Sequence, residues 1–64
     1  MEGSNVSTER ILELLRTDPG QDVKSLAKQL SINRTFLAGY LKALEEQRVV
    51  RSKMVGPARI YFKI

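Results

Sequence analysis

The sequence predicts a small, mainly helical α+β domain in which three helices precede a β-hairpin. Three observations support this fold class: apolar residues recur at helical spacing in three segments, alternation with a period of two begins after Arg48, and a Gly-Pro turn divides the alternating stretch. A chain of 64 residues is long enough for one domain with a small core. We expect residues 1–6 to form a flexible tail and residues 7–64 to form the domain.

The first helix is expected to begin after Ser7, whose hydroxyl can cap the amides of the first turn. Glu9 lies in that turn, where the helix dipole favours a carboxylate. The helix is expected to end at Asp18-Pro19-Gly20, because proline disfavours the helical conformation of the residue before it. Its apolar face consists of Ile11, Leu12, Leu14 and Leu15.

A second, shorter helix is expected over residues 23–30, with Asp22 as its cap. Its apolar residues fall on one side, whereas Lys24 and Lys28 fall on the other. The two lysines are therefore expected to be exposed. The side expected to face the core carries Val23, Leu26, Ala27 and Leu30.

A third and longer helix is expected from Arg34 to about Gln47, with Asn33 as its cap. Phe36 lies on the flank of this helix, and we expect it to pack at the edge of the core. The core face is expected to carry Leu37, Tyr40, Leu41 and Leu44, and the outward face Thr35, Ala38, Gly39, Lys42 and Glu46.

Residues 50–63 predict an antiparallel hairpin around the turn Val55-Gly56-Pro57-Ala58. An isolated hairpin is marginal in water, so its apolar side must pack on the helices. That side is expected to carry the residues that alternate with the outward ones: Val50, Ser52, Met54, Ile60, Phe62 and Ile64. The residues expected to point outward are Arg51, Lys53, Tyr61 and Lys63.

The composition excludes several kinds of catalytic site. The chain has no cysteine and no histidine, which removes thiolate chemistry and the commonest metal ligand and general base. Glu45 and Glu46 are adjacent on a helix and do not face each other, and no glycine-rich nucleotide loop is present. We therefore expect no enzymatic activity, no cofactor and no metal. No apolar run approaches the about 18 residues of a membrane span, so we expect a cytoplasmic protein.

The charge is distributed unevenly along the chain. The formal net charge is +4, yet residues 1–22 hold five acidic and two basic residues, a net of −3. Residues 23–64 hold nine basic and two acidic residues, a net of +7. A one-sided basic field indicates a polyanionic partner, with nucleic acid first, and a solvated basic surface is the alternative.

Particular residues resemble those of a known family. Leu26-Ala27, Ile32-Asn33-Arg34-Thr35 and Val49-Val50 are similar to the core of many bacterial and archaeal winged helix-turn-helix transcription regulators. The segment from Gly56 to Phe62 is similar to the wing of archaeal winged-helix domains, some of which are fused to signalling domains. The resemblance covers about residues 7–64. At Arg48 the family often has glycine, because a helix commonly ends there on a left-handed residue.

The resemblance implies DNA binding, with helix 34–47 in the major groove and hairpin 50–63 on the backbone or in the minor groove. The small outward side chains agree, because they let a helix approach base edges closely. If Phe36 does not pack at the edge of the core, the alternatives are a contact with a thymine methyl group and an apolar patch for a partner. Gly39 costs about 1 kcal/mol relative to alanine in a helix, so its presence indicates close approach to DNA, close approach to a neighbouring element, or plain tolerance. The candidate DNA-binding residues are Arg34, Thr35, Ala38, Gly39 and Lys42 on the third helix, Arg51, Lys53 and Arg59 in the hairpin, and Lys24 and Lys28 on the second helix.

The predicted function is a DNA-binding domain of a transcription regulator, with double-stranded DNA as its partner. A protein–protein interaction module without DNA binding is one alternative. RNA binding by the same scaffold is another, although no RNA-recognition motif with stacked aromatic residues is present. Such domains often bind as dimers. We expect either a weakly binding monomer, or a longer protein that supplies a homodimer contact or a fused or associated signalling domain; the end at Ile64, inside a strand, favours the longer protein.

Overall fold

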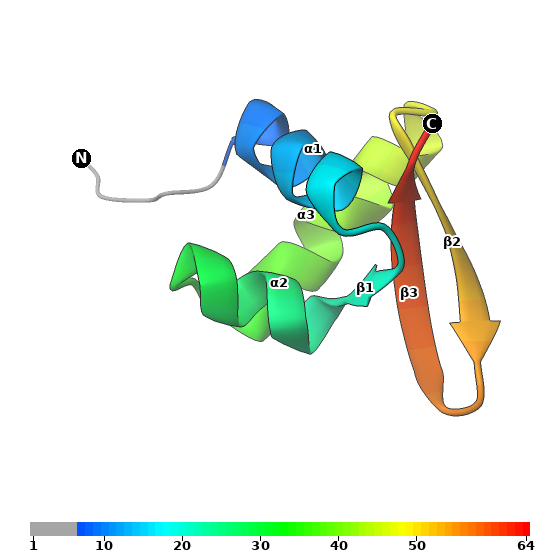
Figure 1. Cartoon of the computed structure of the whole chain (residues 1–64). Coiled ribbons are helices and arrows are strands. Elements are labelled where there is room, and N and C mark those ends of the chain that lie inside the picture. Colours follow the sequence, from blue (N-terminus) through cyan, green and yellow to red (C-terminus); the bar gives the residue numbers. More distant parts are fainter. Residues whose placement is uncertain (1–6) are drawn as a thin grey trace.

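The computed structural model describes residues 7–64, and the predicted tail over residues 1–6 lies outside them. Three helices lie together on one side, and a hairpin extends away from them on the other (Figure 1). The α+β fold class predicted by the sequence is confirmed. The elements are α1 (Thr8–Thr17), β1 (Gln21–Asp22), α2 (Val23–Leu30), α3 (Arg34–Glu46), β2 (Val50–Val55) and β3 (Ala58–Lys63).

Each helix begins at the capping residue that the sequence predicts. Ser7, Asp22 and Asn33 each accept a hydrogen bond from the backbone amide three residues later, over 3.1, 2.8 and 2.9 Å. The hydrogen bond from the Ser25 amide lowers the pKa of the Asp22 carboxyl below its ordinary value, because it stabilises the charged form. At α3 the cap is Asn33, and its bond to the Phe36 amide fixes the first turn and the orientation of the side chains there.

The chain leaves α3 through a left-handed residue. Arg48 has a φ of 64°, in the region that favours glycine. Its amide donates to the carbonyl of Glu45, and the Val49 amide donates to the carbonyl of Leu44. A left-handed residue costs a non-glycine side chain about 1 kcal/mol, and here it turns the chain sharply from α3 into β2.

The core lies between the three helices and the inner side of the sheet. The predicted apolar faces of the helices form it, although Leu12, Leu14 and Val23 are only half-buried at its edge. Half-buried Tyr40 links α3 to α1 through its hydroxyl, 3.1 Å from Thr8 Oγ1. Burying these aliphatic side chains is the main stabilising contribution available to a domain of this size. The fully buried large side chains are Ile11, Leu15, Leu26, Leu30, Leu37, Leu41 and Val50.

The sheet has three antiparallel strands in the order β1-β3-β2, so β3 is the central strand. β1 is two residues long, too short for its alternation to be visible in the sequence, and it pairs Gln21 with Tyr61. Gln21 is buried, and its side-chain amide donates to the carbonyl of Leu14 over 3.0 Å. β1 therefore fastens the segment after α1 to the edge of β3 that the hairpin leaves free.

The predicted orientation of β3 is wrong at Tyr61, which is only 4% exposed and belongs to the core. Residues directly opposite each other in an antiparallel pair share a face. Ser52 pairs with Tyr61, and Ser52 lies two residues from the fully buried Val50, so Tyr61 must point the same way. We call this side, which faces α3, the inner face of the hairpin; it carries Val50, Ser52, Met54, Arg59, Tyr61 and Lys63.

The opposite side, the outer face, carries Ile60 and Phe62, which we expected to point inward. Met54 and Ile64, which we also expected to point inward, are more than half exposed. Phe62 and Ile60 are half-buried there, because the chain between α1 and β1 covers part of this face. Gly20 has a φ of 83°, and a Cβ at that position would lie 3.4 Å from the Phe62 ring. Gly20 thus provides both the left-handed turn and the close contact, so β3 is packed on both sides. The outer face consists of Arg51, Lys53, Val55, Ala58, Ile60 and Phe62.

Candidate nucleic-acid interface

The outward face of α3 is a narrow surface with few large side chains. Leu37 and Leu41 are fully buried on the opposite side of the helix, which turns the predicted face away from the core. Ala38 is half-buried, and Glu46 is exposed at the end of the helix. The exposed candidates on α3 are Arg34, Thr35, Gly39 and Lys42.

Gly39 lies at the middle of this surface, and the structure removes one of its three interpretations. A Cβ built on Gly39 would have nothing within 4 Å among the described residues. No neighbouring element of residues 7–64 therefore requires a glycine at this position. Close approach to an external partner and plain tolerance are the interpretations that survive.

A hollow of about 360 Å³ joins α3 to the hairpin. Ala38, Lys42 and Glu45 contribute its α3 side, and Arg59 and Tyr61 contribute its β3 side. Lys42 and Arg59 are both exposed, so their charges are available to an anion in front of the hollow. The register of the hairpin creates this arrangement, because it turns Arg59 toward α3.

Arg59 is held in place by a chain of two hydrogen bonds. Its Nη1 donates to Ser52 Oγ over 3.0 Å, and Ser52 Oγ donates to Glu45 Oε2 over 2.8 Å. Burial raises the pKa of the neighbouring Tyr61 hydroxyl above its ordinary value, with the positive charge of Arg59 opposing that shift. Tyr61 therefore stays neutral at physiological pH. The two hydrogen bonds orient Arg59 through contacts within the domain.

Arg51 and Lys53 lie on the other side of the hairpin. The Arg51 Cζ atom is 5.2 Å from the centroid of the Phe62 ring, and Lys53 Nζ is 6.0 Å from it. These are cation–π distances, and they direct both cations over the outer face. The hairpin candidates predicted from sequence are thus divided between two faces, with Arg59 alone next to α3.

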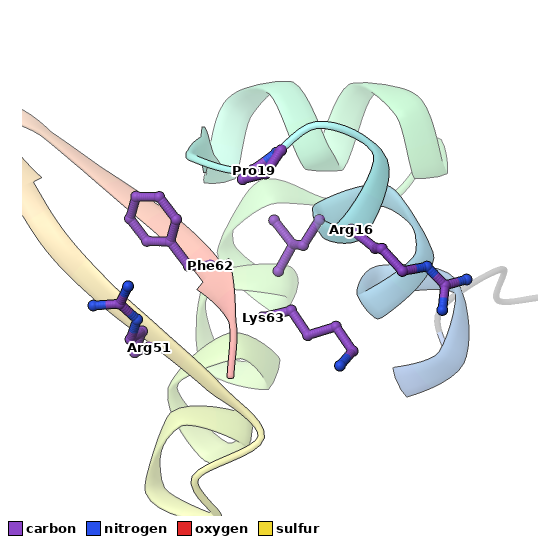
Figure 2. Close-up of a pocket in the computed structure, with 6 residues that line it drawn as sticks. Arg16, Pro19, Arg51, Phe62 and Lys63 are labelled. Carbon is purple, nitrogen blue, oxygen red and sulfur yellow. The ribbon is translucent and has the colours of Figure 1, made fainter.

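A second hollow, of about 280 Å³, lies between the outer face and α1 (Figure 2). Figure 2 shows Phe62 next to Pro19 with Arg51 on the adjacent strand. Arg16 turns its guanidinium away from Phe62 in this view, and it forms an ion pair with Glu13. The hollow is lined by Leu15, Arg16, Pro19, Arg51, Phe62 and Lys63.

The two candidates on α2 are exposed as predicted, but they stand apart from both hollows. Lys24 and Lys28 lie on the outward side of α2 and line neither one. Within residues 7–64 no group of three or more His, Cys, Asp or Glu residues is placed to hold a metal ion. Over the same residues, no helix is long and apolar enough to cross a membrane.

Phe36 does not pack at the edge of the core, so that interpretation is wrong. Its side chain is 54% exposed in the first turn of α3. The ring instead stands against Tyr40, with 6.2 Å between centroids and an angle of 53° between the planes. The two alternatives, a contact with DNA and an apolar patch for a partner, remain open.

Two residues that line the hollow beside α3, Glu45 and Tyr61, and the adjacent Ser52 were not among the sequence candidates. Glu45 and Ser52 orient Arg59, and Tyr61 forms part of the wall. The sequence could have indicated that Tyr61 points inward. Val50 and Ser52 share a face of β2, and the turn fixes which residues of β3 lie opposite them.

Three helices followed by a hairpin that is bonded to the third helix through Ser52 and Glu45 define a winged helix-turn-helix domain. Residues 5–51 match the family model described as winged helix-turn-helix DNA-binding, so the chain belongs to this family. The match spans α1 to α3 and ends at Arg51, which leaves Lys53 and Arg59 outside it. No curated protein and no solved structure matches the chain significantly.

Proposed function

We propose that this winged helix-turn-helix domain binds specific DNA sequences as part of a transcription regulator in the cytoplasm. Helix α3 enters the major groove, and the hairpin lies along the backbone or in the adjacent minor groove. The observation that carries the proposal is the hollow in which Lys42 of α3 and Arg59 of β3 lie beside the open surface around Gly39.

The reading of base edges is assigned to the first two turns of α3. The major groove admits a single helix, and the small surface of Thr35, Ala38 and Gly39 lets the α3 backbone approach the bases. Arg34 lies in the first turn, from which its guanidinium can reach a guanine or a phosphate. Glu46 lies at the opposite end of α3, and its charge favours a docking in which that end points away from the duplex.

Positioning on the duplex is assigned to the cations. Lys42 and Arg59 flank one hollow, so a single backbone phosphate can contact both. The bond to Ser52 restricts Arg59 before DNA arrives, which lowers the entropy lost on binding. Arg51 and Lys53 on the outer face, and Lys24 and Lys28 on α2, are assigned more distant phosphate contacts.

Fluorescence anisotropy with a random-sequence duplex, from about 50 to 200 mM salt, tests this proposal. Each phosphate contact contributes about −0.9 to the slope of log affinity against log salt, so three to six contacts give roughly −3 to −5. Lys42→Ala should reduce the steepness of that slope by about 1. Lys63→Ala is the matched control, because Lys63 is an exposed lysine at the other hollow and should change the slope much less.

A flat or unmeasurable signal in this experiment would reject DNA binding and favour the protein–protein interaction module. The same loss for Lys42→Ala and Lys63→Ala would leave DNA binding intact but reject the docking through α3. The two parts of the proposal are therefore separated by one set of measurements.

Gly39→Ala separates close approach to DNA from plain tolerance. Because the added Cβ meets nothing within the domain, the substitution should raise the free energy of unfolding by about 1 kcal/mol. If the α3 backbone approaches the bases at this point, DNA affinity should fall although stability rises. Urea unfolding and anisotropy on the same sample measure both quantities. A more stable variant with unchanged affinity would show that the glycine is merely tolerated.

A further inference from the structure

Phe36 is an unusual residue for an exposed position on a helix. Among the described residues, the large apolar side chains that are more than half exposed are Phe36, two residues at the tip of the hairpin and the last residue, Ile64. Phe36 is thus the one member of this group that lies on a helix. Since the core does not need its ring, its place at the start of α3 invites a functional explanation.

The Phe36 side chain is held in a defined position. Its backbone amide donates to Asn33 Oδ1 over 2.9 Å, which fixes the first turn of α3. Its ring stands against Tyr40, and the Tyr40 hydroxyl is in turn 3.1 Å from Thr8 Oγ1 of α1. One side of the ring is therefore supported by the domain, while the rest remains open to a partner.

The surroundings of Phe36 are basic and uncrowded. Arg34 and Thr35 precede it in the same turn, and both are exposed. Gly39 lies three residues later, where helix neighbours meet, and contributes no side chain beside the ring. The positive charge of Arg34 and the open space beside the ring suit a DNA groove, whereas an extended apolar partner would have to cover that charge.

We propose that Phe36 contacts the C5-methyl group of a thymine in the major groove and makes the domain prefer thymine at that position. The inference rests on the proposed function, because it requires α3 to lie in the major groove. The thymine methyl is the apolar group that base pairs present in that groove, so it is the feature an exposed phenyl ring can recognise. Removing one methyl group and its surface from water changes affinity by about fourfold.

Replacement of thymine by deoxyuridine tests the contact, because uracil lacks the methyl group and keeps the same hydrogen-bonding edge. A preferred duplex is first selected from a random library with the full chain. Anisotropy then measures affinity after each thymine is replaced in turn. We expect one or two positions at which uracil lowers the affinity of the unmodified chain about fourfold. Phe36→Ala should bind the thymine duplex correspondingly more weakly and should not distinguish thymine from uracil at those positions.

Ile64→Ala provides the matched control, because Ile64 is 61% exposed and lies outside α3. It should keep the preference for thymine in full, and circular dichroism should show that both variants fold. A thymine preference that persists in Phe36→Ala would overturn the assignment and transfer the contact to another residue. Equal binding of thymine and uracil duplexes with a steep salt slope would overturn it while leaving DNA binding intact. Absence of salt-dependent binding to any duplex would overturn the proposed function itself, together with this inference.

Discussion

The two faces of the β2–β3 hairpin carry similar charges in very different surroundings. On the inner face, Arg59 is tied through Ser52 to Glu45 of α3, and Tyr61 is buried beneath it. On the outer face, Arg51 lies over the Phe62 ring and faces solvent. The inner face of the hairpin is therefore linked to α3, whereas the outer face is partly covered by the chain around Gly20 and exposes Arg51.

The difference follows from strand geometry rather than from the number of charges. Successive side chains of a strand point to opposite faces. The hairpin register therefore places Arg59 on one face, and Arg51 with its cross-strand partner Phe62 on the other. The register in turn follows from the burial of Val50, the first residue of β2. Basic residues of one wing are thus unequal candidates for DNA contact.

The largest effect that distinguishes the two faces is expected on stability. Tyr61→Ala removes an aromatic side chain from the core and should cost about 3–5 kcal/mol, most of the stability that a domain of this size has. Phe62→Ala removes a half-buried ring from the outer face and should cost less than half as much. Urea unfolding measures both. Equal losses would contradict the assignment of the core to the inner face.

The next largest effect is expected on DNA affinity. Arg59→Ala removes a cation that is oriented beside α3, and it should lower affinity about eightfold at ~0.1 M salt and make the salt slope less steep by about 0.9. Arg51→Ala removes the same charge from the outer face and should have a smaller effect. Anisotropy across salt compares the pair, with unfolding measured in parallel. A larger loss for Arg51→Ala would assign the DNA-binding side of the hairpin to the outer face.

The helices could be predicted from the sequence because their signals are local. Ser7, Asp22 and Asn33 cap their helices through bonds to the amides three residues later, and each apolar face can be read from a spacing of three or four. Arg48 occupies the position where a helix commonly ends on a left-handed residue, and the structure shows that arginine takes this conformation here. The core face and the outward face of α3 followed from these local rules, whereas Phe36 on the flank is exposed instead of packed at the edge of the core.

The sheet could be predicted only in part, because its decisive contacts are distant in sequence. β1 is a two-residue strand fixed by pairing with β3, some 40 residues later, and nothing local distinguishes it from a loop. Tyr61 looked like an outward residue because Ile60 and Phe62 are more apolar. The cover that Gly20 and its neighbours give to the outer face makes that comparison misleading. Because the prediction assigned Tyr61 to the wrong face of the sheet, it also missed the hollow that Tyr61 and Arg59 line beside α3.

The smallest effect that distinguishes the faces is the cation–π interaction on the outer one. Arg51 is the direct cross-strand partner of Phe62, and its guanidinium carbon lies 5.2 Å from the ring centroid. A double-mutant cycle of Arg51→Ala and Phe62→Leu should give a coupling energy of about 0.5–1 kcal/mol, the range for exposed pairs. Lys53 is 6.0 Å from the same ring and is not its direct partner, so the cycle of Lys53→Ala with Phe62→Leu should give less.

Both cycles are measured by thermal or urea unfolding without DNA. Because both contain Phe62→Leu, the effect of that substitution on packing cancels when the two coupling energies are compared. Coupling for Arg51 would show that its guanidinium is held against the ring in the free domain, so binding a phosphate there must first disrupt a stabilising contact. Arg59 carries no such cost, because the bond to Ser52 uses one side of its guanidinium and leaves other donors for a phosphate. Zero coupling for Arg51 would remove this reason for ranking Arg59 above it, and the two arginines would then compete for DNA on position alone.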